Sequence, residues 1–287
     1  MTKYPLFISN TCWVGKKVDG TNMRKLNLSF FYELGGHLDA LANLETSNAT
    51  TVDTFVHAVN LTKMLPNLFD AYPDQLKVSK AEYSKLKKQL DICVNWNIKN
   101  KEDQDKEPSP SFSGLKYAAE QFQILLVAEL GTFGAFSINQ KGIYNTTDLV
   151  EKAENTLPES IRRKLSANVT IEIREGGKCL AFDTPTASGF HMLRATESVL
   201  HLYYIEVCKP PTTDSLDNWG AYIATLNKST DAEVKKVVAM LQQIKDLDRN
   251  LIMHPEVILD SEQAFTLFET LKAVIIEMAS KLPNPVI

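Results

Sequence analysis

Apolar residues recur every three to four positions along most of this chain, which is the period of a helix with one buried face. In the first half the pattern predicts helices within residues 22–44, 50–70, 79–98 and 115–130. In the second half it predicts helices within residues 146–157, 158–165, 186–208, 215–228, 231–253 and 260–282. So many helical segments predict an all-α protein of the helical-bundle type.

Extended structure is expected at only a few places. Residues 4–9 and 132–142 are typical of short extended segments, so at most a short strand or hairpin is predicted. The stretch 169–182, VTIEIREGGKCLAF, gives two signals. Its β-branched start is typical of a strand, whereas its second part runs into helix-like sequence, and the pattern alone leaves both open.

The predicted helix ends follow from capping residues. Ser79 with Glu82 three residues later predicts a capping box at the start of a helix. The long helix within 186–208 begins at Thr184 or Thr186, and the last helix opens at Asp260.

The sequence KNKEDQDKEPSPS, residues 99–111, is the one sustained polar and charged stretch. This composition is typical of an exposed loop and predicts a boundary between two regions. Residues 1–110 are then a helical N-terminal region of unknown role, and residues 111–287 form a second helical domain.

Composition limits the function classes. The N-terminal residues lack a continuous apolar core of a signal peptide, and no window holds 18 apolar residues, so a cytoplasmic protein without a membrane span is expected. The four cysteines are widely scattered, so zinc is not expected, and neither is any cofactor. The net charge of −4 argues against a surface coated for non-specific nucleic-acid binding, but it allows a local basic patch.

The sequence DRNLIMHPE, residues 248–256, carries the candidate chemistry. Asn250 and His254 are four apart, so they share a helix face, and the long side chain of Arg249 can reach the same place. Pro255 restricts His254 to the frayed end of the helix. Arginine can bind a phosphate and stabilise its developing charge, while histidine can move a proton near neutral pH. This set suits phosphodiester cleavage without a metal.

The same residues also fit an ordinary helix end. His254 then complements the helix dipole, and Arg249 is a surface residue. An arginine followed at this distance by a histidine arises often by chance, so the pair alone does not decide between the two interpretations.

The surroundings of the pair resemble the HEPN family of small helical domains. RNLIMHP near the end of a penultimate helix, followed by a final amphipathic helix, is similar to the Arg-polar-x-x-x-His motif of HEPN ribonucleases. Arg194 and Glu197 in the long helix resemble the Arg-x-x-Glu pattern that lines the same cleft, although their spacing also fits an intrahelical salt bridge. The resemblance covers about residues 183–282 and extends loosely upstream, where it implies a helix near 169–181.

This resemblance implies a metal-independent endoribonuclease of the toxin–antitoxin or antiviral-defence type. Arg249 would bind the scissile phosphate, His254 would act as acid or base, and Asn250, Glu197 and Arg194 would support them. The products would carry a 2′,3′-cyclic phosphate and a 5′-hydroxyl. HEPN ribonucleases build their site from two facing copies, so a homodimer is expected, together with an antitoxin or defence-system partner protein.

Two further hypotheses remain open. One is a non-catalytic HEPN-like module that binds RNA, a nucleotide or a protein, and the other is a helical scaffold. HEPN toxins paired with a nucleotidyltransferase usually have a tyrosine two residues after the histidine, where this chain has Glu256. That departure puts control by a nucleotidyltransferase in doubt.

Overall fold

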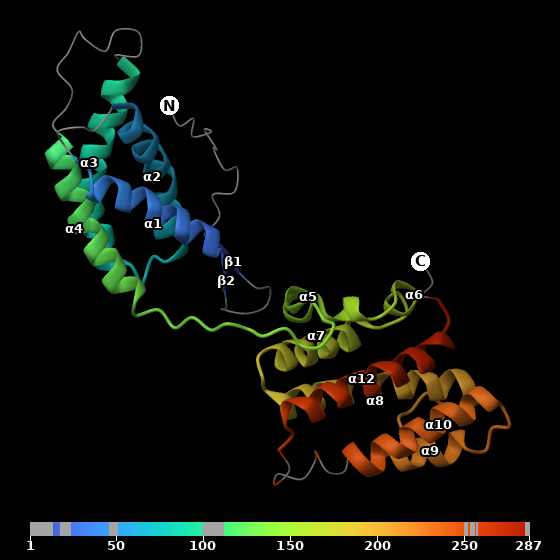
Figure 1. The fold of residues 1–287 in the computed structure, drawn as a ribbon. Helices are drawn as coiled ribbons and strands as arrows, with labels where there is room; N and C mark the ends of the chain where they lie inside the picture. The colour runs from blue at the N-terminus through green and yellow to red at the C-terminus, as the bar shows by residue number, and fades with distance from the viewer. Residues whose placement is uncertain are drawn as a thin grey trace. The chain divides into compact units, whose positions relative to one another are not determined.

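The fold is all-α, as the hydrophobic pattern predicts, and it divides into two compact units (Figure 1). The computed structural model describes residues 14–17, 24–45, 51–99, 112–249, 252, 256 and 258–284. The first unit spans Met1–Ala135 and the second spans Phe136–Ile287. The segment 4–9, predicted to be extended, lies outside the described residues.

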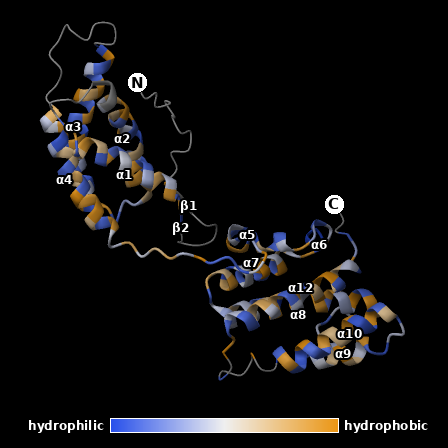
Figure 2. Ribbon diagram, viewed as in Figure 1, coloured by the Kyte–Doolittle hydropathy of each residue, from blue (hydrophilic) through white to orange (hydrophobic). Residues whose placement is uncertain are grey.

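The first unit is a bundle of helices with one small antiparallel pairing of strands. Its elements are β1 (Gly15–Lys17), β2 (Arg24–Leu26), α1 (Leu28–Ala42), α2 (Thr51–Ala71), α3 (Lys77–Lys99) and α4 (Phe112–Leu130). Helix α1 packs against α2 and α4, and α3 packs against the same two helices. Hydrophobic and hydrophilic residues alternate around these helices, and the buried apolar side chains meet in a shared core (Figure 2).

The boundary between the units falls after Ala135, whereas the sequence placed it after residue 110. Helix α4 accounts for the difference. It follows the polar stretch 99–111 in the sequence, yet it packs on α1 and α3 and buries residues such as Phe122 and Leu126 in the core of the first unit. The polar stretch 99–111 therefore falls within the sequence range of the first unit, and its residues 100–111 lie outside the described residues.

The start of α3 is capped by a residue distant in sequence. Ser79 is the third residue of α3, so the prediction that it is the N-cap is wrong. Instead, the carboxylate of Glu129 in α4 accepts the backbone N–H groups of Val78 and Ser79, both at 2.8 Å, and the hydroxyl of Ser79 as well. Glu129 therefore satisfies backbone N–H groups at the start of α3 that a local N-cap residue would otherwise bind.

The second unit is built around a long central helix. Its elements are α5 (Thr146–Lys152), the 3₁₀ turn η1 (Ala153–Thr156), α6 (Glu159–Arg162), α7 (Ala167–Ala181), α8 (Pro185–Cys208), α9 (Trp219–Leu226), α10 (Ala232–Ile244), the π-helical segment η2 (Lys245–Arg249) and α12 (Ser261–Ser280). Helix α8 packs against α7, α9 and α12. The largest buried side chains of this unit include Tyr203, Trp219 and Phe268.

The stretch 169–182, for which the sequence left strand and helix open, is helical and belongs to α7. Its glycines explain the close packing: the carbonyl of Gly176 accepts the hydroxyl of Ser188 on α8 at 2.9 Å, and Gly177 faces Ala153 of η1. The segment 132–142 is irregular backbone and turns, with no strand assigned.

The expected helix ends of the second unit are mostly confirmed. Thr184 occupies the N-cap position of α8 without a side-chain capping bond. At the start of α12, the side chain of Asp260 accepts the backbone N–H of Gln263, and the side chain of Gln263 accepts the backbone N–H of Asp260. The two residues therefore form a capping box. Among the described helices, none is both long and apolar enough to cross a membrane.

Candidate functional site

One face of α8 carries a row of aromatic, charged and imidazole side chains. Phe190, Arg194, Glu197 and His201 are spaced by 4, 3 and 4 residues, so they follow one face of the helix. Phe190 and Arg194 are exposed, while Glu197 and His201 are half-buried. We call these four residues the α8 stripe.

Arg249 lies beside the α8 stripe at the end of the π-helical segment that continues α10. Its Nη2 atom is 3.8 Å from Oε2 of Glu197, and 24% of its side chain is exposed. Its guanidinium lies over the ring of Trp219, 5.4 Å from the centroid. Single π-helical turns within α-helices occur frequently at functional sites.

The distance between Arg249 and Glu197 has a chemical consequence. At 3.8 Å the two groups attract each other, but the separation is longer than a hydrogen bond. Glu197 therefore orients the guanidinium without occupying its N–H donors, so those donors can bind a phosphate in two-point fashion. The Trp219 ring further restricts the plane of the guanidinium.

Helix α9 supplies the aromatic side of the site. The side chain of Asn218 caps α9 through the N–H of Ala221, which places Trp219 in the first turn with 1% exposure. One turn later, the hydroxyl of Tyr222 accepts the N–H of Leu216 at 3.0 Å and lies 3.1 Å from Nδ1 of His201.

Two acidic groups of the site have raised pKa values. Burial, with a smaller contribution from the charge of Glu197, raises the pKa of Tyr222, although the backbone N–H bond opposes it. Burial also raises the pKa of Asp248, the residue before Arg249. Both shifts disfavour the negatively charged forms of these two groups.

A second network meets the same stripe from α7. Glu172 lies 2.8 Å from Nη2 of Arg194 and 2.8 Å from Nδ1 of His191, one oxygen to each. Only 16% of the Glu172 side chain is exposed, while 57% of Arg194 is exposed. The ring of Phe190 lies 6.0 Å from the guanidinium of Arg194. Glu172 thus fixes an arginine that faces solvent.

The structure describes three of the five predicted site residues. Arg249 and Glu197 contact each other, and Arg194 lies on the same stripe but pairs with Glu172. Arg194 and Glu197 do not form the intrahelical salt bridge that their spacing allows, because each pairs with a residue of another element. Asn250 and His254 lie outside the described residues.

Sequence reasoning missed Glu172 and did not single out Trp219. Glu172 lies in the stretch 169–182, for which the sequence left strand and helix open. Once this stretch is known to be the helix α7, the face of α7 that packs on α8 can be inferred. Nothing local marks Trp219 as a platform for an arginine 30 residues later. Within the described ranges, no group of three His, Cys, Asp or Glu side chains is arranged to hold a metal ion.

Comparison with known proteins adds no relative, because no family model, no curated protein and no solved structure matches this chain.

Proposed function

We propose that the second unit is a HEPN-type endoribonuclease that cleaves RNA inside the cell without a metal ion, in a toxin or antiviral-defence role. One observation supports it most directly. Arg249, the first residue of the proposed Arg-Asn-x-x-x-His motif, is oriented by Glu197 and Trp219, and Glu197 stays too far from its N–H donors to form a hydrogen bond with them. A surface arginine at an ordinary helix end has no need of two such partners.

The proposed reaction is an internal transfer at phosphorus. The 2′-oxygen attacks the adjacent phosphorus, the bond to the 5′-oxygen breaks, and a 2′,3′-cyclic phosphate and a 5′-hydroxyl result. A base takes the proton of the 2′-hydroxyl, and an acid gives a proton to the leaving 5′-oxygen. His254 performs one of these transfers, Arg249 stabilises the charge on the phosphate, and Asn250 positions it.

The remaining polar residues of the stripe have supporting roles in this proposal. Glu197 positions Arg249, and Arg194 binds a neighbouring phosphate of the same strand. A homodimer brings two such sites together, and an antitoxin or other defence protein restrains them. A chain that stays monomeric at micromolar concentration would count heavily against the dimeric form of the proposal.

The decisive experiment is cleavage of a mixed pool of tRNA and single-stranded RNA in the presence of EDTA. Wild type is compared with Arg249→Ala and His254→Ala. The matched control is Arg163→Ala, because Arg163 is an exposed arginine whose partner, Glu159, lies on its own helix. Wild type and the control should cut, and the two site variants should not. The new 5′ ends should accept phosphate from a polynucleotide kinase without prior dephosphorylation.

Other outcomes point to the other hypotheses. If wild type binds a fluorescent RNA without cutting it, and Arg249→Ala weakens that binding, the unit is a non-catalytic binding module. If wild type neither binds nor cuts at low salt, the scaffold hypothesis is left.

A further inference from the structure

Phe190, His191 and Arg194 lie close together on α8, and Glu172 of α7 joins two of them. One oxygen of Glu172 is 2.8 Å from Nδ1 of His191, and the other is 2.8 Å from Nη2 of Arg194. The ring centroid of Phe190 is 6.0 Å from the guanidinium carbon of Arg194 and 6.5 Å from the ring centroid of His191. An aromatic ring, an imidazole and a guanidinium are therefore held within reach of one small ligand.

Glu172 sets the hydrogen-bonding character of His191. A carboxylate oxygen only accepts hydrogen bonds, so Nδ1 of His191 carries the proton of the bond to Glu172. When the ring is neutral, Nε2 therefore keeps its lone pair and accepts hydrogen bonds. Among the described residues Nε2 has no hydrogen-bond partner, and the side chain of His191 is only half-buried. His191 thus presents an acceptor to a hydroxyl group of a ligand.

Arg194 presents hydrogen-bond donors beside this acceptor. A guanidinium has five N–H donors, and the contact with Glu172 involves the Nη2 nitrogen alone. Because the side chain of Arg194 is exposed, its other donors are accessible to a ligand. Planar N–H groups of this kind match the oxygens of a phosphate. Arg194 can therefore bind a phosphate while Glu172 fixes its position.

Phe190 adds an exposed aromatic ring to the cluster. Such rings stack on unpaired nucleobases, and every base offers a face for stacking. His191 neighbours both Phe190 and Arg194, so its acceptor lies near the aromatic ring and the phosphate donors alike. A nucleotide has the same composition, because its ribose joins an aromatic base to a phosphate.

We propose that Phe190, His191 and Arg194 form a subsite for one unpaired ribonucleotide of an RNA strand. Phe190 stacks on the base, Nε2 of His191 accepts the 2′-hydroxyl of the ribose, and Arg194 binds the phosphate. Glu172 is the positioning residue that holds the imidazole and the guanidinium. Because the 2′-hydroxyl distinguishes RNA from DNA, His191 makes the subsite selective for RNA. This inference rests on the action on RNA proposed for the second unit.

The subsite adjoins the proposed cleavage centre. Arg194 precedes Glu197 by three residues, which is less than one turn of α8, and Glu197 contacts Arg249. A strand whose scissile phosphate binds Arg249 can therefore place a nearby nucleotide on the subsite. The subsite selects the kind of strand, and the bond that breaks lies at Arg249.

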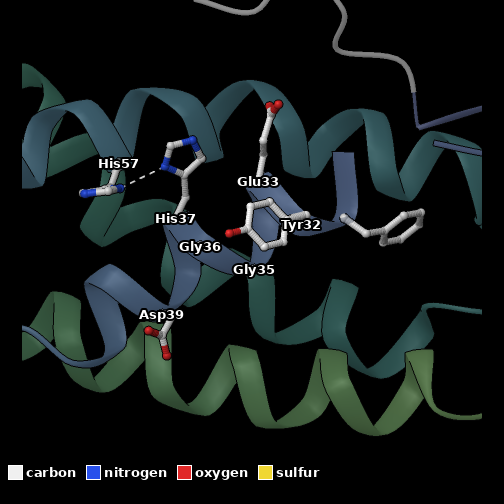
Figure 3. A pocket seen from close by; sticks show the side chains of 8 residues that line it. Tyr32, Glu33, Gly35, Gly36, His37, Asp39 and His57 are labelled. Carbon is white, nitrogen blue, oxygen red and sulfur yellow. Dashed lines mark hydrogen bonds between the residues drawn. The ribbon is translucent and has the colours of Figure 1, made fainter. Parts of the chain in front are cut away.

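The pocket of the first unit is a poor alternative place for this nucleotide. It has a volume of about 600 Å³ and lies beside α1, where Figure 3 shows Tyr32 and Glu33. Its described lining contains two carboxylates, Glu33 and Asp39, and no Lys or Arg. Negative charge without a cation repels a phosphate. Tyr32, an exposed aromatic residue of this pocket, therefore serves as the control for Phe190.

The test measures binding of two fluorescent single strands, oligouridine and oligodeoxyuridine of equal length, to the full-length protein by fluorescence anisotropy. Every protein carries His254→Ala, so that the RNA is not cut during the measurement. The pH is mildly alkaline, where an imidazole is ordinarily neutral. This background protein should bind the RNA more tightly than the DNA, and circular dichroism checks the fold of each variant.

The histidine variants test recognition of the ribose. His191→Asn keeps an amide N–H in the place of Nδ1 for Glu172 but lacks Nε2. It should weaken RNA binding by roughly three- to tenfold, the loss expected for one hydrogen bond, and leave DNA binding unchanged. His191→Gln has an acceptor oxygen near the position of Nε2, so it should recover part of the preference for RNA.

The other variants test recognition of the base and the phosphate. Phe190→Ala should weaken binding of both strands by about tenfold, because the bases of either strand can stack. Arg194→Ala should also weaken both, and it should reduce the salt dependence by about one phosphate contact. The control, Tyr32→Ala, should change neither affinity.

Failure of the subsite and failure of the proposed cleavage are distinguishable. The subsite would be overturned, even if wild type cuts RNA, by any of three results: no preference for RNA, an equal loss of RNA and DNA affinity in His191→Asn, or unchanged affinity in Phe190→Ala. The expected changes in a protein whose wild type cuts no RNA would support the subsite and remove the cleavage. A protein that binds neither strand would overturn both.

Discussion

The guanidinium of Arg249 lies over the buried ring of Trp219, 5.4 Å from the centroid. Trp219 is fixed by its burial in the first turn of α9, whereas Arg249 comes from a π-helical segment that continues α10. The ring therefore acts as a rigid platform that sets the plane of a charged group arriving from another element. A planar group held in this way is suited to two-point binding of a phosphate.

The first prediction concerns the shape of that charged group. Arg249→Lys keeps the positive charge but loses the planar fork, so cleavage of RNA should fall by roughly a hundredfold, the scale seen when one donor to the transition state is removed. Single-turnover rates in EDTA measure the effect, and circular dichroism checks the fold. The same change at Arg163, an exposed residue, should leave the rate within a factor of about two. A lysine variant that cuts as fast as wild type would mean that Arg249 acts only as a point charge.

The second prediction separates positioning from binding at Glu197. Glu197→Gln removes a negative charge beside Arg249, so RNA binding should stay equal or tighten. Cleavage should nevertheless fall, by about tenfold, because the guanidinium loses the carboxylate that orients it. Fluorescence anisotropy gives the Kd, and single-turnover kinetics give the rate. Parallel loss of binding and rate would indicate a purely structural role for Glu197.

Local chemistry made most of the fold predictable. The helical period identified the helices of both units other than α7, although the first predicted helix, within 22–44, also took in strand β2. Asp260 marked the start of α12 because its side chain caps a residue only three positions away. The resemblance implied that Glu197 supports Arg249 or His254, and the structure places Glu197 3.8 Å from Arg249. The helical period and the capping residues can be identified from the sequence because both depend on residues close together in the chain.

The features that the sequence did not predict depend on contacts between residues far apart in the chain. The cap of α3 is Glu129, 50 residues after Ser79, so a local serine and glutamate pattern gave the wrong answer. The β-branched residues at the start of α7 favoured a strand in isolation, but packing of this segment on α8 makes it helical. Glu172 gains its two partners only through that packing.

The third prediction tests the distant cap of α3 by pH. Burial alone would raise the pKa of Glu129, but the bonds from Ser79 and Val78 outweigh it and lower the pKa below its usual 4.5. A lowered pKa stabilises the fold above pH 4.5, and the contribution disappears as the pH falls through the folded-state pKa. Glu129→Gln should therefore weaken protection of the first turn of α3 by about 1 kcal/mol at pH 7. Hydrogen exchange should show this difference closing at acid pH, and a constant difference would contradict the assignment.

The fourth prediction contrasts glycines in two helices. A side chain at Gly177 would overlap the Cβ of Ala153 and lie 2.9 Å from the carbonyl oxygen of Leu149, so Gly177→Ala should cost about 1–3 kcal/mol. Gly35 in α1 has nothing within 4 Å, so Gly35→Ala should stabilise the helix by about 0.5–1 kcal/mol. Thermal unfolding of the two variants should therefore shift in opposite directions, and a shared direction would show that one of the two environments is described wrongly.

The last prediction contrasts two tyrosines of the second unit. Tyr203 is fully buried, and among the described residues its hydroxyl has no hydrogen-bond partner. Burial, with the charges of Asp231 and Glu233 adding to it, raises the pKa of Tyr203 to about 12, so the hydroxyl stays protonated. Tyr203→Phe removes a polar group that forms no bond, so stability should be unchanged or higher by up to about 1 kcal/mol.

Tyr222 provides the matched comparison, because its hydroxyl joins Leu216 and His201. Tyr222→Phe leaves the N–H of Leu216 and the imidazole without their partner, so it should cost about 1–2 kcal/mol. It should also reduce cleavage, since α9 carries the Trp219 platform beneath Arg249. Urea unfolding measures both stabilities. If Tyr203→Phe proved the more costly of the two, the hydroxyl of Tyr203 would have to take part in a bond that stabilises the core, and the contrast drawn between these tyrosines would be wrong.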